Sequence, residues 1–208
     1  MTGKQRRKSR LILVLGGAAS GKSQMALDLA RGLAPSVASG LRRVPVPVRM
    51  GQTPRADARK GVSPRFAFVA TGQALDREMK IRIERHQATR SPDWETAEVP
   101  ADLADWFAGN SHNYQAIVLD CLTLWLSNVT GKCPDDLAVS EATLKLLQTI
   151  RGTRARVVIV SNELGLGLVP VTKTVRAFRD LAGRVNQQVA AEADEVYLAV
   201  SGLPLRLK

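Results

Sequence analysis

The sequence feature that most constrains the fold is a run of small residues between an apolar segment and an amphipathic one. Residues 11–15 read Leu-Ile-Leu-Val-Leu, a short β-favouring run that ends at two glycines. Residues 16–23 read GGAASGKS and match the pattern G-x-x-x-x-G-K-[ST]. Apolar side chains at three-to-four spacing then predict a helix over 23–33. A strand, this loop and a helix, in that order, predict a phosphate-binding loop.

The residue types of this loop suit a bound nucleoside triphosphate. Small residues let backbone N–H groups converge on phosphate oxygens, and the helix N-terminus adds partial positive charge. Lys22 is expected to reach the β- and γ-phosphates, and the Ser23 hydroxyl to bind Mg²⁺. The predicted nucleotide contacts here are Gly16, Gly17, Ala18, Ala19, Ser20, Gly21, Lys22 and Ser23.

Strand and helix patterns alternate along the rest of the chain. Nearly continuous apolar runs predict further strands over 66–70, 116–120, 156–160, 196–200 and 203–207. Helical patterns cover 76–87, 100–108, 122–129, 139–150 and 172–193. Apolar strands alternating with helices predict an α/β fold with a mostly parallel central sheet covered on both faces. The predicted class is a P-loop NTPase (RecA-like) three-layer sandwich, a single domain over 10–208.

The net charge of +11 lies in two stretches that do not look folded. Residues 1–10 carry +5 and predict a flexible basic tail, while residues 36–65 carry +6. Repeated prolines within 35–64 predict a mobile insertion. The ordered remainder is charge-balanced, and only 4% of the residues are aromatic, so base stacking on nucleic acid is disfavoured.

Composition also bears on the compartment. No run approaches the roughly 20 apolar residues of a membrane helix. The N-terminal apolar run has five residues, shorter than the roughly 7–15 of an export signal. Two cysteines, Cys121 and Cys133, are too few for a disulfide scaffold. We therefore expect a cytoplasmic protein without a membrane span.

Two further residues are candidates for chemistry. Asp120 ends an apolar strand, where it would hold the Mg²⁺ shell or cap the next helix, and both roles stay open. His86 closes a charged helix beside arginines; a neutral imidazole is a competent nucleophile near pH 7, and a helix-end histidine is also common as a capping residue. His112 is interpreted as a loop residue.

Several motifs, taken together and in order, resemble one family. They are GGAASGKS at 16–23, ATGQ at 70–73, RIxxH…R…W.T.E over 82–98, SNELGLGLVP at 161–170 and FRDLAGRVNQ at 178–187. The chain resembles the bifunctional adenosylcobinamide kinase/adenosylcobinamide-phosphate guanylyltransferases of cobalamin biosynthesis. The likeness covers about residues 10–208 apart from the insertion.

The resemblance implies two reactions. In the first, ATP or GTP phosphorylates the hydroxyl of the aminopropanol arm of adenosylcobinamide. In the second, GTP guanylylates an enzyme histidine and releases pyrophosphate, and GMP then passes to the cobinamide phosphate to give adenosylcobinamide-GDP. It also implies a homo-oligomer, a trimer in the family.

Carried over position by position, the resemblance places the guanylylated histidine on His86 and the phosphate loop on residues 16–23. The predicted catalytic residues are therefore His86 and, from the loop motif, Lys22. The further implied nucleotide contacts are Ala70, Thr71, Gly72, Gln87, Ala88, Thr89, Arg90, Glu98 and Asp120. Two of these depart from the usual pattern: Gln87, where a basic residue is common, and Asp120, where glutamate is common. Glu163, after the fourth strand, is a candidate for metal or substrate contact or a turn residue.

Two other functions compete with this one. The first is a small P-loop kinase or ATPase that forms no guanylyl-histidine. The second is a nucleic-acid-binding ATPase whose basic stretches follow the phosphates, with an affinity that falls steeply with salt.

Overall fold

The computed structural model describes residues 9–34, 65–88, 92–131 and 135–208. The predicted basic tail, apart from Ser9 and Arg10, and the predicted insertion at 35–64 lie outside these residues. The same holds for Thr89, Arg90 and Cys133.

Seven strands form one sheet in the order β3-β2-β4-β5-β1-β6-β7. The first five pairings are parallel, and the last strand is antiparallel to its neighbour. The strands are β1 (Leu11–Gly16), β2 (Phe66–Ala70), β3 (Trp94–Glu98), β4 (Ala116–Asp120), β5 (Arg156–Asn162), β6 (Glu195–Val200) and β7 (Leu203–Arg206). Parallel neighbours need crossover helices, and those helices cover both faces of the sheet.

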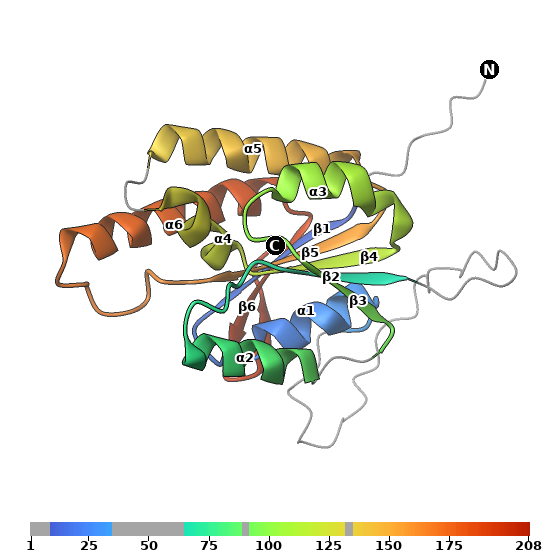
Figure 1. Ribbon diagram of the computed structural model, residues 1–208, viewed down its shortest axis with the longest axis horizontal. Helices are drawn as coiled ribbons and strands as arrows, with labels where there is room; N and C mark the ends of the chain where they lie inside the picture. Colours follow the sequence, from blue (N-terminus) through green and yellow to red (C-terminus); the bar gives the residue numbers. More distant parts are fainter. Residues whose placement is uncertain (1–8, 35–64, 89–91, 132–134) are drawn as a thin grey trace, which may run out of the picture.

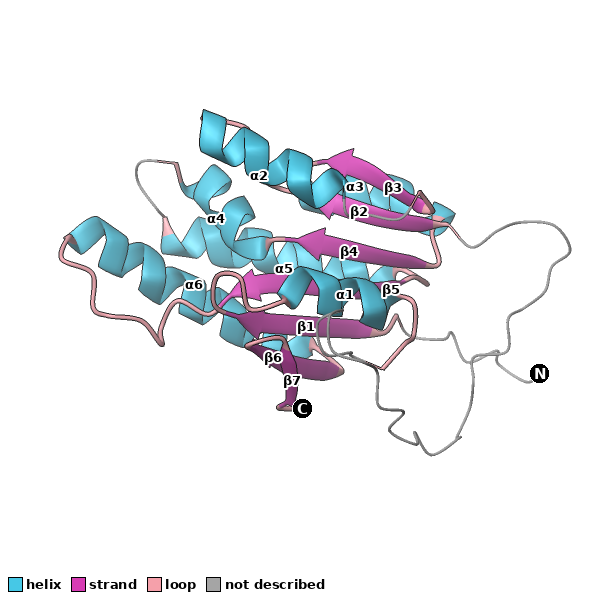
Figure 2. Ribbon diagram, turned by 90° about the horizontal axis from the view of Figure 1, so that it is seen from below, coloured by secondary structure: helices cyan, strands magenta, loops and turns pink. Residues whose placement is uncertain are grey.

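The helices divide unequally between the two faces (Figures 1 and 2). On one face lie α1 (Lys22–Ala30) and α2 (Arg77–Ala88). On the other lie α3 (Leu103–Asn110), α4 (Leu122–Thr130), α5 (Asp136–Gly152) and α6 (Lys173–Glu192). A 3₁₀ turn spans Ser111–Asn113. The predicted three-layer α/β architecture is confirmed.

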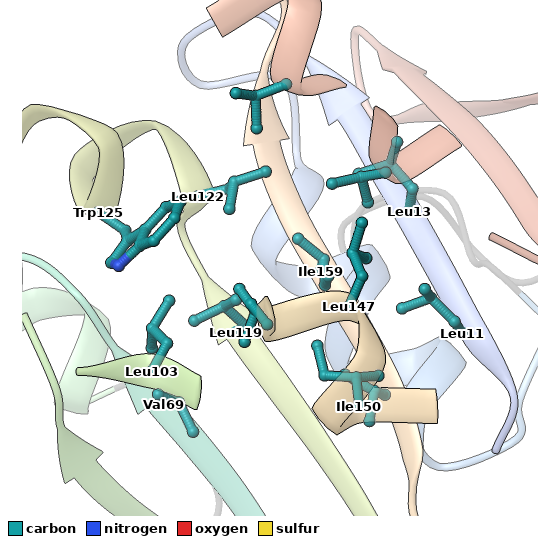
Figure 3. Close-up of a cluster of buried hydrophobic side chains, with 14 of the residues drawn as sticks. Leu11, Leu13, Val69, Leu103, Leu119, Leu122, Trp125, Leu147, Ile150 and Ile159 are labelled. Carbon is teal, nitrogen blue, oxygen red and sulfur yellow. The ribbon is translucent and has the colours of Figure 1, made fainter. Parts of the chain in front are cut away.

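Because both faces are covered, the core has two layers. The larger joins alternate residues of the central strands to the four-helix face, and the smaller joins the other residues of those strands to α1. Figure 3 shows part of the larger layer, in which strand residues Leu11, Leu13, Leu119 and Ile159 lie with the α5 residues Leu147 and Ile150. Burial on both faces explains why these strands read as continuous apolar runs.

The element that the sequence analysis missed is β3. The sequence analysis predicts a nucleotide contact at Glu98 and no strand over residues 94–98, but these residues form a parallel edge strand beside β2. Its residues Glu95, Thr96 and Glu98 are exposed, so it has neither the continuous apolar run nor the regular alternation that marks a strand. The other predicted strands and helices are present, with bounds shifted by a few residues.

The two-layer core predicts a steep cost for truncating its centre. Leu119 of β4 is 0% exposed, and Leu119→Ala should lower the free energy of unfolding by about 2–5 kcal/mol because it removes apolar contacts and leaves a cavity. Leu144→Ala, at a residue 46% exposed on α5, is the matched control and should cost less than about 1 kcal/mol. Urea unfolding followed by circular dichroism measures both; equal losses would contradict this account of the core.

Candidate functional site

The loop between β1 and α1 has the backbone that a phosphate-binding loop needs. Gly21 has φ 91°, a left-handed conformation that favours glycine, and a Cβ there would lie 3.3 Å from the Gly202 Cα. At Gly16, a Cβ would lie 2.6 Å from the Ala199 carbonyl oxygen. Both glycines therefore permit close approaches that side chains would prevent, and α1 begins at Lys22 with its N-terminus at the loop.

The two predicted metal ligands, Ser23 and Asp120, lie together. The Ser23 hydroxyl donates a hydrogen bond of 2.6 Å to Asp120 Oδ2, although 97 residues separate them in sequence. Ser23 is the second residue of α1, and Asp120 is the last residue of β4. A hydroxyl and a carboxylate side by side are oxygen ligands of the kind that Mg²⁺ prefers.

Lys22 is held inside the loop. Its side chain is only 8% exposed, and its ammonium donates to the Gly17 carbonyl. Burial lowers the pKa of Lys22 because it removes water from the charged form, and the nearby Asp120 and Cys121 partly oppose this shift. The cation therefore lies at the loop with little competing solvent.

The carboxyl ends of three strands align beside this loop. Ala70 of β2 pairs in register with Asp120 on one side and with Glu98 of β3 on the other. In parallel strands, register partners project toward the same face, so Asp120 and Glu98 belong to the face covered by α1 and α2. The predicted contacts Ala70, Glu98 and Asp120 thus form one row at the sheet edge.

Thr71 fixes the backbone next to Asp120. Its hydroxyl donates 2.7 Å to the Cys121 carbonyl and accepts 2.9 Å from the Cys121 N–H, and its own N–H donates 3.2 Å to the Asp120 carbonyl. Thr71 is fully buried. Its side chain therefore holds the segment after β4 in place.

Burial also raises the pKa of the Cys121 thiol to about 12, which keeps it protonated at neutral pH.

The candidate nucleophile His86 lies in the last turn of α2, three residues after Ile83. A Cβ on Gly72 would lie 3.8 Å from Ile83 Cδ1, so this part of α2 packs against the end of β2. The described structure includes the backbone of His86, Gln87 and Ala88 but not their side chains, and Thr89 and Arg90 lie outside it. The helix that carries His86 shares the face of α1 (Figure 1).

His112 lies elsewhere. It belongs to the 3₁₀ turn that precedes β4, at the amino ends of the parallel strands. Asp120 ends that same strand at the opposite edge of the sheet. The interpretation of His112 as a loop residue agrees with its place in this short turn, and the residue lies at the edge of the sheet opposite the site.

Sequence reasoning missed two residues of α4 that position the site. Asn128 Nδ2 donates to the carbonyl oxygens of Thr71 at 2.8 Å and Pro100 at 2.9 Å, and so ties the ends of β2 and β3 together. The Thr123 hydroxyl accepts 2.8 Å from the Asn162 N–H at the end of β5. Their only signal is that they are polar residues in a helix whose other residues are mostly apolar.

Comparisons with known proteins identify a family for this chain. Residues 46–207 match the model of a family described as cobinamide kinase / cobinamide phosphate guanyltransferase. The chain belongs to this family.

Curated relatives are named as bifunctional adenosylcobalamin biosynthesis proteins. The chain is 36% identical over 172 residues to the bifunctional adenosylcobalamin biosynthesis protein CobU of Escherichia coli, which covers 77% of this chain and 95% of the relative. It is 34% identical over 196 residues to the protein CobP of Pseudomonas aeruginosa, which covers 94% of this chain and 96% of the relative. The predicted family, and with it the predicted class of bifunctional transferase, is confirmed.

Two solved structures have a similar arrangement of strands and helices. A KaiC-like protein from Pyrococcus horikoshii OT3 has a TM-score of 0.45 at 9% identity and covers 92% of this chain and 71% of its own. The RadB recombinase has a TM-score of 0.44 at 14% identity and covers 91% of this chain and 73% of its own.

Among the helices that the structure describes, none is long and apolar enough to cross a membrane.

The burial of Lys22 predicts that its positive charge lowers the stability of the folded protein. Its ammonium costs stability wherever the pH is below its lowered pKa, and the cost disappears as the pH rises toward the ordinary value of 10.5. Lys22→Met should therefore raise the unfolding free energy of the nucleotide-free protein at pH 7 by on the order of 1 kcal/mol, with a smaller gain at alkaline pH. Urea unfolding at several pH values measures it.

The exposed Lys80 of α2 supplies the control for this prediction. Lys80→Met should change stability by less than about 0.5 kcal/mol, without a trend in pH. A loss of stability in Lys22→Met would show that the ammonium stabilises the empty loop, contrary to the prediction.

Proposed function

We propose that this chain phosphorylates adenosylcobinamide with ATP or GTP and then transfers GMP from GTP to the product, with both reactions at the carboxyl edge of the sheet. The observation that carries the proposal is the contact between Ser23 and Asp120 at the phosphate loop, in a chain of the cobinamide kinase / guanyltransferase family. This contact brings together the two residue types that position a nucleotide's metal ion.

In the kinase step, the hydroxyl oxygen of the acceptor arm attacks the γ-phosphorus. The bond from that phosphorus to the β–γ bridging oxygen breaks, the nucleoside diphosphate leaves and the hydroxyl proton is released. The loop N–H groups and Lys22 bind the phosphates and neutralise the charge that develops on them. The low exposure of Lys22 supports this role, because a desolvated cation acts more strongly on a nearby phosphate.

Ser23 and Asp120 would hold Mg²⁺ in this site. The ion supplies charge neutralisation at the β- and γ-phosphate oxygens when it is bound. The 2.6 Å hydrogen bond supports the assignment, because it brings a hydroxyl oxygen and a carboxylate oxygen side by side.

In the second reaction we propose His86 as the nucleophile. An imidazole nitrogen attacks the α-phosphorus of GTP. The bond from that phosphorus to the α–β bridging oxygen breaks, and pyrophosphate leaves. A phosphate oxygen of the cobinamide phosphate then attacks the guanylyl phosphorus, the P–N bond breaks, and the imidazole is restored. The position of α2 on the face of α1, beside the ends of β2 and β3, supports this role.

The remaining proposed nucleotide contacts fall into two groups. One group follows His86 in sequence, and the other lies at the carboxyl ends of β2 and β3. They are Ala70, Thr71, Gly72, Gln87, Ala88, Thr89, Arg90 and Glu98. The Thr71 hydroxyl is hydrogen-bonded to the backbone of Cys121. We therefore propose that Thr71 contributes to nucleotide binding by its position in the backbone. We also propose a cytoplasmic homo-oligomer, trimeric by family resemblance.

Covalent labelling tests the nucleophile. Incubation with α-³²P-GTP should leave a label that is lost in acid and retained in base, as expected of a phosphoramidate. His86→Ala should abolish the label because it removes the attacking nitrogen. The chain has two histidines, so His112→Ala is the matched control and should label like the unsubstituted protein.

The labelling experiment also separates the competing functions. A label that persists in His86→Ala would exclude that residue as the nucleophile. Phosphorylation of cobinamide without any label would favour a kinase that lacks guanylyl transfer. Nucleotide hydrolysis stimulated by nucleic acid, and lost at high salt, would favour the nucleic-acid-binding ATPase.

A metal titration tests the proposed pair of ligands. Asp120→Asn keeps the shape of the side chain but removes its charge, so the Mg²⁺ concentration for half-maximal kinase activity should rise about tenfold or more. Asp105→Asn, at an exposed residue of α3, should leave this concentration unchanged. An unchanged Mg²⁺ requirement in Asp120→Asn would contradict the assignment.

A further inference from the structure

Two motifs of this chain have no role in nucleotide binding as proposed above. They are SNELGLGLVP at 161–170 and FRDLAGRVNQ at 178–187. The first covers the end of β5 and the loop that follows, and the second lies within α6. In the structure they form the two walls of one cavity of about 680 Å³, within the range of roughly 300–1,000 Å³ usual for small-molecule sites.

Glycines line both walls of the cavity. Gly165 and Gly167 come from the loop, and Gly183 comes from α6. A Cβ on Gly183 would meet nothing within 4 Å, so the helix has open space at this position. Glycine inside a helix costs roughly 1 kcal/mol relative to alanine, so helix stability gives no reason for it here.

A buried polar group at this cavity lacks a partner. Asn186 of α6 lines the cavity and is 4% exposed. Its Nδ2 donates 3.1 Å to the Asn162 carbonyl, but its Oδ1 is buried without a hydrogen-bond partner among the residues that the structure describes. An unpaired buried acceptor is costly, so it points to a ligand that supplies an N–H or O–H donor.

The cavity is joined to the phosphate loop. Leu15, which lines it, directly precedes Gly16. The Glu163 N–H donates 3.1 Å to the Gly16 carbonyl, and Glu163 Oε1 accepts 2.8 Å from the Gly165 N–H. The cavity opens on the α6 face, whereas α1 and α2 lie on the other face. A ligand here approaches the loop from the side opposite the row of Ala70, Glu98 and Asp120.

We propose that this cavity is the acceptor site and holds the amide- and hydroxyl-bearing arm of cobinamide, with an N–H or O–H of that arm donating to Asn186 Oδ1. This inference rests on the proposed function, because it assigns a place to the acceptor of that reaction. The small residues make room for the arm, and Asn186 orients it. Its hydroxyl end lies toward Gly16.

A substitution that fills the cavity tests the site. Gly183→Leu should weaken cobinamide binding at least about tenfold, a change that corresponds to about 1.4 kcal/mol, because the new side chain occupies the open space. Equilibrium dialysis, read from the visible absorbance of cobinamide, measures the dissociation constant. Gly109→Leu is the matched control at an exposed position of α3 where a Cβ also meets nothing, and its binding should stay within about twofold.

Two further measurements distinguish a blocked site from a damaged protein. Gly183→Leu should unfold at the same or a higher temperature than the unsubstituted chain, and it should keep its label from α-³²P-GTP. Should Gly183→Leu not fold, Asn186→Leu takes its place and should also weaken binding about tenfold. Its control is Gln188→Leu, which removes another unpartnered buried amide oxygen of α6 away from this cavity.

The inference is overturned if Gly183→Leu folds and binds cobinamide within about twofold of the unsubstituted chain. If the unsubstituted chain binds no cobinamide, the proposed function fails and the inference fails with it. If the unsubstituted chain binds cobinamide and Gly183→Leu binds it equally well, only the acceptor site is overturned, so the two failures are separate results.

Discussion

The hydrogen bond between Ser23 and Asp120 depends on nearly everything else in the structure. Ser23 is placed by the sharp loop between β1 and α1, and Asp120 is placed by the end of β4. These two strands are not neighbours, because β5 lies between them. The contact therefore exists only while three parallel strands keep their register and while α1 stays packed on their shared face. Parallel pairing and a two-layer core are the physical conditions of the site.

The site also shows where stability is given up for chemistry. Lys22 is buried with a pKa lowered by desolvation, and this burial opposes folding while it prepares a cation for phosphate. Around it, uncharged groups supply rigidity: Thr71 holds the peptide at Cys121, and Asn128 ties β2 to the residues after β3. Neutral hydrogen bonds thus fix the edge of the sheet, and the charges are left for the ligand.

The sheet edge separates two approaches to the phosphate loop. The row formed by Ala70, Glu98 and Asp120 belongs to the face of α1 and α2, whereas the cavity with Asn186 and Gly183 opens on the face of α6. An acceptor on one face and a nucleotide on the other can meet at the edge without competing for the same surface. This arrangement gives the motifs at 161–170 and 178–187 a physical purpose that a nucleotide site alone does not require.

The sequence by itself determined the strands, the helices and the phosphate loop, because continuous apolar runs and the spacing of glycine, lysine and serine are local patterns. It missed β3, whose exposed polar residues become a strand only because β2 lies beside them. It named Ser23 and Asp120, but their contact is a product of strand order, which no local pattern contains. The roles of Asn128 and Asn186 were decided by tertiary structure alone. A single polar residue in a helix acquires its meaning from the carbonyl group it meets, or from the partner it lacks.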